Sequence, residues 1–477
     1  MAVTRDHLLC DRNPSLTVGE VRLLDYFESG LDKGWRLFQF LNYALNVFRL
    51  GRTLRRLSDG RRDPDIPTCD VVLSLMMAAL LRVPSLNQLE DLLCNGRFQK
   101  LLGHRGAKLR GKKLFSADTV AKVLDTIEVA ALQAAMVELV KKAAENKVFR
   151  EDTYGSFVTV AIDGWEPFKS YKRHCEGCLT RQVTFKKEEV EDEDDIDQVG
   201  EKVTQYYHRF VVAFLVAPKV DLTLAIEPIL SADLREDLSV KEARHEGELT
   251  AALRLIDRLH KDYGCFIDAF ALDGLYPCGP VFKKLTQYNY GAFVILKNKR
   301  KDPLKFAEEI WRIENKPGTV AQDPVTGEHV EFWRLDDVSA LKSFDGSVDV
   351  LKAVVRRKDG KKGTWAMALV GKAKRASPLL ALRIMRARWH IENGFHQWVT
   401  QWNFGHCFRH TANAITAVMH IWAITFNFMQ LFFYRRLGKK RRKRKAPDTI
   451  VACIKEMWTD LGAITEPVPW TLLFDST

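Results

Sequence analysis

The sequence predicts an α/β protein with a helical N-terminal region. Two observations lead to this fold class. Residues 18–148 carry apolar side chains at helical spacing. From Ser156 onward, short runs of β-branched and aromatic residues alternate with helical segments, in the order three strands, helix, strand, helix, strand. This order is typical of a sheet covered by helices.

The N-terminal region is expected to consist of helices joined by basic loops. An apolar helix over 71–81 is interrupted at Pro84 and resumes over 86–93, and Ser116 is placed to cap a helix over 117–141. The connections over 51–63 and 103–113 are rich in arginine, lysine and glycine. Two interpretations fit this pattern: a DNA-docking region and a solvated helical bundle.

Beyond residue 150 the expected elements define the rest of the chain. Strands are expected at 157–162, 206–216, 222–229, 266–272 and 292–296, with helices at 246–263 and 281–287. Strand-like runs follow at 330–335, 348–356 and 364–370, then a helix over 378–402 and an apolar helix over 412–434. We divide the chain into a helical DNA-binding region (1–150), a first part of the α/β core (151–296), a β-rich insertion (297–377), a second part of the core (378–436) and a basic C-terminal tail (437–477).

Charge is distributed unevenly along the chain. Its 477 residues include 73 Lys and Arg against 61 Asp and Glu, and the net charge of +12 favours a polyanionic partner. Residues 188–197 carry eight acids, so removing those eight negative charges leaves +20 on the rest. The acidic run is either a solvated loop or a competitor of DNA for the basic surface. A run of seven cations at 439–445 either contacts DNA phosphates or keeps a tail soluble, and it includes Lys440, Arg441, Arg442, Lys443 and Arg444.

No membrane association or export is expected. An uninterrupted stretch of about 18 apolar residues is absent from the sequence, and the best candidate, 414–434, contains His420, Asn427 and Gln430. We therefore interpret 414–434 as a buried helix of the core. The first residues lack the apolar segment of a secretory signal. Nine cysteines without such a signal predict reduced thiols in a cytosolic protein.

Three carboxylates are candidates for a metal site. Asp163 (in VAIDGW) and Asp273 (in FALDGLY) both end a predicted strand, where side chains reach the crevice that binds ligands in open α/β sheets. Each Asp-Gly pair taken alone is more often a turn. Glu392 lies on the late helix, and Arg388 precedes it by one turn on the same face. Three carboxylates suit Mg²⁺ or Mn²⁺, and two such ions can activate a nucleophile and stabilise a leaving oxygen. Glu166 and Glu227 are nearby acids, for which structural hydrogen bonding is the alternative role.

The sequence resembles the DDE transposases of bacterial insertion sequences, whose catalytic domain is similar to ribonuclease H. The resemblance spans roughly residues 65–435 and rests on VPSLNQLEDLL, AIDG, ALDGLY and RARWHIENGF. It implies a mixed five-stranded sheet flanked by helices, with Asp163, Asp273 and Glu392 binding two Mg²⁺ ions. It also implies double-stranded DNA as partner, a homodimer when two ends are synapsed, and a cytoplasmic, nucleoid-associated enzyme of a prokaryote.

One branch of that family places a β-rich insertion before the Glu helix. The branch has Tyr, Arg, Glu and Lys at fixed spacing, and here Arg388 and Glu392 fit, whereas Met385 and Val399 replace Tyr and Lys. The DNA phosphate contacts of that Tyr and Lys then come from other residues or are absent. The candidates are Arg388, Arg386 and His396, with Gln397 beside them. Related enzymes stack a flipped base on an insertion aromatic, for which Trp333 is the candidate among three tryptophans and core packing the alternative.

A second group of residues suggests a metal site of another kind. Cys175 and Cys178 form a Cys-x-x-Cys turn, and His174 or His208 could complete a Zn²⁺ site. Plain thiols and a redox pair are the alternatives. This turn and the acidic run share one excursion, at about 170–202, between the first two predicted strands.

We therefore expect a transposase that cuts DNA at transposon ends and transfers the freed 3′-hydroxyl strand into target DNA, without a covalent protein–DNA intermediate. Two alternatives remain: an inactive, domesticated relative that binds DNA without cutting it, and a ribonuclease H-like nuclease without strand transfer.

Overall fold

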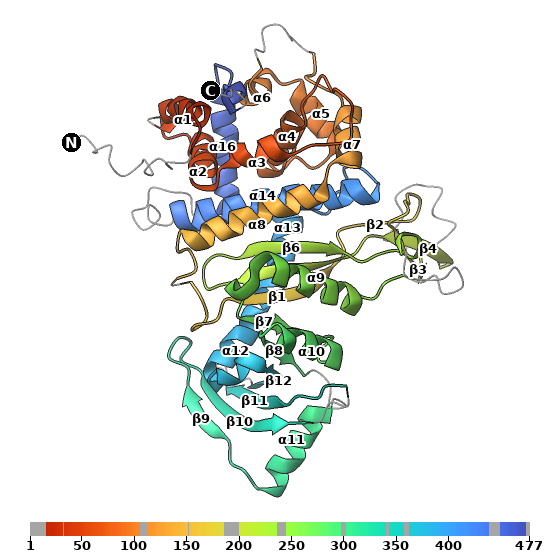
Figure 1. Cartoon of the computed structure of the whole chain (residues 1–477), viewed down its shortest axis with the longest axis vertical. Helices are drawn as coiled ribbons and strands as arrows, with labels where there is room; N and C mark the ends of the chain where they lie inside the picture. The colour runs from red at the N-terminus through yellow and green to blue at the C-terminus, as the bar shows by residue number, and fades with distance from the viewer. Residues whose placement is uncertain are drawn as a thin grey trace, which may run out of the picture.

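The computed structural model describes residues 16–31, 33–104, 112–150, 152–185, 200–235, 245–296, 302–339, 343–356, 362–437 and 449–473. The molecule is elongated, with the N-terminal helices at one end, a large sheet in the middle and the strands before the Glu392 helix at the other end (Figure 1). The acidic run at 188–197 and the cations at 439–445, including Lys440, Arg441, Arg442, Lys443 and Arg444, lie outside the described residues.

The N-terminal region is helical, as expected. Its helices are α1 (Val18–Leu31), α2 (Arg36–Phe48), α3 (Leu50–Arg56), α4 (Thr68–Leu80), α5 (Leu86–Leu93), α6 (Gly96–Leu101), α7 (Ala117–Thr126) and α8 (Val129–Glu145). Ser116 caps α7 by accepting a hydrogen bond from the Thr119 backbone N–H. The single helix expected at 117–141 is wrong, because extended backbone at Ile127 and Glu128 divides it into α7 and α8.

The C-terminal segment is not an exposed tail where it is described. Helix α16 (Ile450–Ala463) and a 3-10 turn (Trp470–Leu473) pack against α1, α2 and α6, which places the C-terminus beside the N-terminal helices (Figure 1). The indole N–H of Trp470 donates to the Leu101 carbonyl, and that of Trp458 donates to the Leu81 carbonyl. The tail predicted over 437–477 is corrected accordingly, since the apolar face of α16 is buried against those helices.

A mixed sheet of nine strands, where five were expected, runs from the middle of the protein to the end opposite the N-terminal helices (Figure 1). Its order is β6-β5-β1-β7-β8-β12-β11-β10-β9. The strands are β1 (Thr159–Trp165), β5 (Phe210–Val216), β6 (Leu222–Pro228), β7 (Ala269–Leu272), β8 (Gly291–Ile295), β9 (Thr319–Gln322), β10 (His329–Val338), β11 (Val348–Arg356) and β12 (Lys362–Val370). Strand β1 is parallel to β7 and antiparallel to β5, and β7 is parallel to β8.

The extra strands come from the segment predicted as an insertion. Strand β12 pairs antiparallel with β8, in the register Met367 to Ile295. An edge strand leaves backbone N–H and C=O groups without partners, and β12 satisfies those of β8. The β-rich segment therefore continues the core sheet, and helix α11 (Asp302–Ile313) packs on β10, β11 and β12.

Helices flank the sheet, as expected. Helices α8, α9 (Glu248–Tyr263) and α14 (Ala412–Leu431) contact β6, α13 (Trp389–Trp402) contacts β1 and β5, and α10 (Gly279–Gln287) and α12 (Pro378–Ala387) contact β8.

The excursion after β1 folds into a small sheet of its own. Its order is β2-β4-β3, with β2 (Lys169–Ser170), β3 (Leu179–Thr184) and β4 (Lys202–Tyr207). The single strand predicted over 206–216 is wrong, because the chain leaves β4 at His208 and enters β5 at Phe210. The continuous run of aromatic and β-branched residues hides this change of sheet, since both halves have strand propensity.

Helix α14 is the apolar helix that the sequence predicted to be buried. By length and composition Ala412–Arg436 could cross a membrane, yet 94% of its most apolar window is buried inside the protein. Its polar residues have partners: Asn427 bonds with β6, and the His420 Nδ1 lies 2.7 Å from the Thr416 carbonyl oxygen. The prediction of a core helix is confirmed.

Burial of His420 predicts that stability falls in mild acid. Burial and the charge of Arg258 lower its pKa to about 4, although the Thr416 carbonyl opposes them. The unfolded chain takes up this proton near pH 6.5 and the folded protein only near pH 4, so this histidine's share of stability is complete above pH 6.5 and lost as the pH falls towards 4. Through this histidine, the wild-type free energy of unfolding is expected to fall by about 2 kcal/mol between about pH 7.5 and 5, and His420→Asn should not show that fall. Urea unfolding of both proteins at the two pH values checks this, and a pH-independent difference between them would contradict it.

Candidate active site

The two aspartates lie beside each other at one edge of the sheet. Strands β1 and β7 are parallel neighbours, and Ile162 on β1 pairs with Leu272 on β7. The next residues along the chain are Asp163 and Asp273, which therefore lie side by side. Burial selects these strands, because both sequences are apolar up to the aspartate. The Asp163 carboxylate accepts from the Gly164 N–H at 2.9 Å, and the Asp273 carboxylate accepts from the Leu275 N–H at 2.7 Å. Asp273 thus shapes a turn as well, whereas Asp163 lies within a strand.

Arg388 joins Asp163 to Glu392. It sits at the junction of α12 and α13 with a side chain only 2% exposed. Its Nη2 lies 2.7 Å from Glu392 Oε1, and its Nη1 lies 3.4 Å from Asp163 Oδ2. The (i, i+4) spacing predicted from the sequence is thus a partly buried contact, with Arg388 buried and Glu392 partly exposed, and not a fully exposed ion pair of little energetic value. Two of the three predicted carboxylates converge on one guanidinium.

Electrostatics at this edge favour a bound cation. The pKa of Asp163 is raised to about 6, first by burial and then by the negative charges of Asp273 and Glu248, against the lowering effects of the Gly164 N–H and Arg388. Asp273 therefore lies close enough for its charge to act on Asp163. A divalent ion would relieve the repulsion among these carboxylates and favour their ionised form.

Glu248 is a fourth acid at this site that sequence reasoning missed. It lies in the first turn of α9, where it contacts Arg209 Nη2 and accepts from the Tyr276 hydroxyl at 3.0 Å. A Cβ on Gly164 would lie 2.6 Å from Glu248 Oε2, so glycine there lets this carboxylate approach the strand that carries Asp163. An acid in a first helical turn is common for electrostatic reasons alone, so the sequence carried no specific signal.

The other nearby acids have structural partners. Glu166 forms a two-pronged ion pair with Arg181 at 2.7 and 2.9 Å, and Glu227 pairs with Arg254 and Arg258 at 2.6 and 2.9 Å. These ion pairs agree with a structural role for Glu166 and Glu227, the alternative to metal binding.

The residues proposed to contact DNA fall in different surroundings. Arg386 pairs with Glu328 at 2.6 Å, while His396 is exposed on α13. Trp333 is partly buried, and its indole N–H donates to the Lys316 carbonyl at 3.2 Å. Trp389 is 49% exposed, and its ring centroid lies 5.4 Å from the Arg388 guanidinium carbon. An exposed aromatic ring thus lies one turn before Glu392, at a position that sequence reasoning did not single out.

The cysteines of the Cys-x-x-Cys turn come together with two histidines. Cys175 and Cys178 face His208, as predicted, and also His410, which the sequence did not suggest. His174 lies outside this group and stacks on Tyr206, with ring centroids 4.9 Å apart. The position of His410 was hidden because 232 residues separate it from Cys178.

Comparisons with known proteins find one family model and a solved structure that are similar to this chain. A search of the curated proteins finds no match. The cryo-EM structure of a piggyBac transposase synaptic complex with hairpin DNA is similar to this chain with a TM-score of 0.39 and 11% sequence identity, over 87% of this chain and 76% of that one. Residues 236–428, which contain Asp273 and Glu392, match the family model of the transposase DDE domain. Over that segment the chain is therefore similar to DDE transposases.

Proposed function

We propose that this protein is a DNA transposase that cuts DNA at transposon ends and joins the freed 3′-hydroxyl to target DNA. One observation carries the proposal: Asp163 and Glu392 meet at Arg388, and Asp163 lies on β1, the parallel neighbour of the strand that precedes Asp273. The match to the transposase DDE domain covers Asp273 and Glu392 and supports the same assignment.

The sheet supports a ribonuclease H-like core. Its first five strands in chain order, β1, β5, β6, β7 and β8, lie side by side as β6-β5-β1-β7-β8. The first aspartate lies on the first of these strands, the second follows the fourth, and the glutamate lies on a late helix. This is the placement that the resemblance to insertion-sequence transposases implies.

The carboxylates fit a hard divalent cation. Asp163, Asp273 and Glu392 offer only oxygen ligands. Burial and, after it, the negative charges of Asp273 and Glu248 raise the pKa of Asp163, and a bound cation would oppose both effects. We infer that they hold two Mg²⁺ or Mn²⁺ ions. Such ions, when bound, stabilise the attacking and leaving oxygens of phosphoryl transfer. Arg388 fixes the carboxylates of Asp163 and Glu392 relative to each other, and Arg209 and Tyr276 do the same for Glu248.

Double-stranded DNA is the proposed partner, at the transposon ends and at the target. We infer that the N-terminal helices recognise the ends, that Arg386, His396 and the cations at 439–445 contribute to phosphate binding, and that two copies act together when two ends are synapsed. Arg388, predicted as a phosphate contact, is buried between Asp163 and Glu392 and is assigned instead to positioning those carboxylates. From the resemblance to insertion-sequence enzymes we infer that the protein acts in the cytoplasm of a prokaryote.

The test uses the DNA that flanks this gene on both sides. The full-length protein, with Mg²⁺ and a linear DNA carrying those flanks, is expected to nick at the element boundary and to join the end to a plasmid. A second substrate, already nicked at the boundary, isolates the joining step.

The outcomes separate the alternatives. Joining of the nicked substrate supports a transposase. Cleavage without joined product indicates a nuclease, and binding without Mg²⁺-dependent cleavage indicates an inactive relative that acts as a DNA-binding protein.

Trp389 is expected to stack on a DNA base next to the cleavage site. Its ring is exposed beside the carboxylates, and a stacked base contributes about 1–3 kcal/mol. We expect Trp389→Ala to weaken binding of the nicked substrate by about 5- to 150-fold. Fluorescence anisotropy measures this, and Trp389→Phe, which keeps a ring, serves as the control. Equal affinities for all three proteins would contradict the stacking role.

A further inference from the structure

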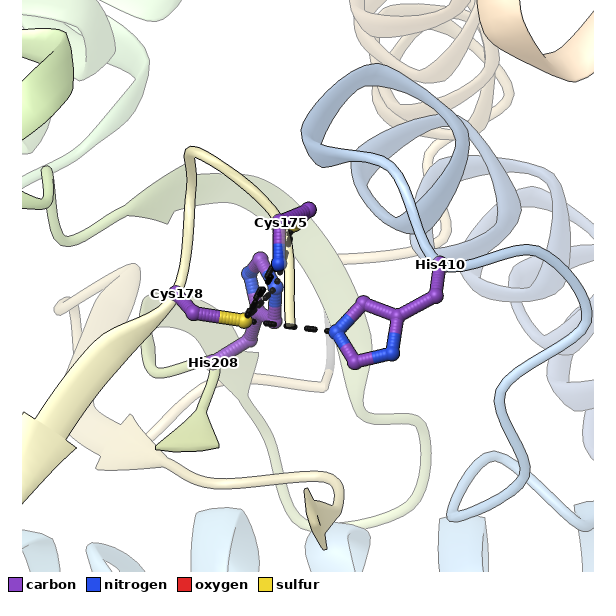
Figure 2. Close-up of side chains that lie close together, drawn as sticks. All are labelled: Cys175, Cys178, His208 and His410. Carbon is purple, nitrogen blue, oxygen red and sulfur yellow. Dashed lines mark hydrogen bonds between the residues drawn. The ribbon is translucent and has the colours of Figure 1, made fainter. Parts of the chain in front are cut away.

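Four side chains from three distant segments converge outside the carboxylate site. Cys175 and Cys178 come from the turn between β2 and β3, His208 from the link between β4 and β5, and His410 from the loop before α14. Figure 2 shows both imidazoles turned toward the sulfur atoms. All four ligand atoms lie within 4.8 Å of one another.

The spacing of these atoms matches a tetrahedron around zinc. The two Sγ atoms are 3.8 Å apart, and the Nε2 atoms lie 3.3 Å from their nearest sulfurs. With Zn–S near 2.3 Å and Zn–N near 2.0–2.1 Å, the edges of a tetrahedral site measure about 3.3 Å between nitrogens, about 3.5 Å between sulfur and nitrogen and about 3.8 Å between sulfurs. A disulfide would need the sulfurs at about 2.05 Å, so the geometry excludes that bond.

The surroundings are built for close packing at this point. The turn is closed by the Cys178 N–H, which donates to the Cys175 carbonyl at 3.0 Å, and the Cys175 N–H lies 3.3 Å from Cys178 Sγ. A Cβ on Gly177 would lie 2.7 Å from Ala412 Cβ and 3.1 Å from His208 Cε1, so only glycine allows this approach. The Cys178 and His208 side chains are both buried, as a closed structural site requires.

We propose that Cys175, Cys178, His208 and His410 bind one structural Zn²⁺ ion. Two thiolates and two imidazoles, with no carboxylate among them, form a soft ligand set that suits Zn²⁺ and not Mg²⁺. The ion would cross-link the small sheet to the start of α14, and so fasten the segment that follows the Glu392 helix to the one that follows Asp163. This proposal does not depend on the transposase assignment.

The first test is the metal content of the full-length protein, purified without chelators and measured by mass spectrometry. We expect one zinc per chain, and its loss in Cys178→Ser and in His410→Asn. Two matched controls should keep the zinc: His174→Asn, beside Cys175 but stacked on Tyr206, and Cys407→Ser, a nearby thiol outside the cluster. The proposal would be overturned if Cys178→Ser and His410→Asn bound as much zinc as the wild type. It would also be overturned if the wild type held no zinc after reconstitution.

A second measurement covers variants that fail to fold. The wild-type protein, loaded with Co²⁺ in place of Zn²⁺, is expected to show the sulfur-to-metal charge transfer and the intense visible bands of tetrahedral coordination. Weak visible bands without charge transfer would contradict thiolate ligation. A thiol titration of the denatured, unreduced protein that finds Cys175 and Cys178 oxidised to each other would do the same.

Discussion

Asp273→Asn is expected to abolish DNA cleavage and to leave DNA binding intact. The amide has nearly the same shape, and its oxygen can still accept from the Leu275 N–H, so the turn after β7 is retained. It lacks the negative charge that a hard divalent cation requires. We expect the rate of Mg²⁺-dependent nicking to fall at least about 10²-fold, comparable with the loss of one preorganised electrostatic contact in other enzymes.

The measurement compares the nicking rate and the affinity for the same flanking DNA. Glu166→Gln is the matched control, because Glu166 is an acid close to Asp163 whose partner is Arg181. It should nick at the wild-type rate. If Asp273→Asn also nicks at close to that rate, the assignment of the carboxylate site is wrong.

Asn427→Leu is expected to cause the largest loss of stability. The Asn427 side chain lies on α14 and forms two hydrogen bonds of 2.8 Å with Thr223, one from the backbone N–H and one to the backbone carbonyl. Strand β6 is an edge strand of the sheet, and its pairing with β5 shifts register near Thr223. The amide thus takes the place of a neighbouring strand. Leucine would leave both buried backbone groups without partners, at about 1–3 kcal/mol each.

The expected loss in the free energy of unfolding is therefore about 2–6 kcal/mol. Urea titration followed by circular dichroism measures it. Thr425→Val is the control on the same helix, because Thr425 is also fully buried and, among the described residues, its hydroxyl bonds to the Ile421 carbonyl of its own helix, and we expect a loss of about 1 kcal/mol or less. Equal losses for the two variants would show that Asn427 is not a strand partner.

What the sequence predicted well is what short segments determine. Asp163 and Asp273 were singled out because a buried apolar run that stops at an acid is a local signal, although β1 continues past Asp163 to Trp165 and only Asp273 follows the end of its strand. The N-cap at Ser116 and the pairing of Arg388 with Glu392 depend on three and four residues of spacing.

What the sequence did not predict depends on contacts between distant segments. His410 joins Cys178 across 232 residues, and Glu248 reaches the carboxylate site only because Gly164 leaves room for it. The nine-stranded sheet has the same origin: the strand-like runs were recognised, but only the pairing of β12 with β8 decides that they extend the core. Helix α16 was missed because the neighbouring run of cations suggested a solvated tail.

The extension of the sheet by β9 to β12 brings the turn between β9 and β10 into contact with helix α12. Helix α12 leads directly into α13, and Arg383 and Arg386 tie α12 to Asp323 and Glu328 around the turn between β9 and β10. The far end of the sheet is therefore coupled rigidly to the helix that carries Glu392. A displacement of the turn between β9 and β10 would therefore move α12 and, with it, the Glu392 carboxylate on α13.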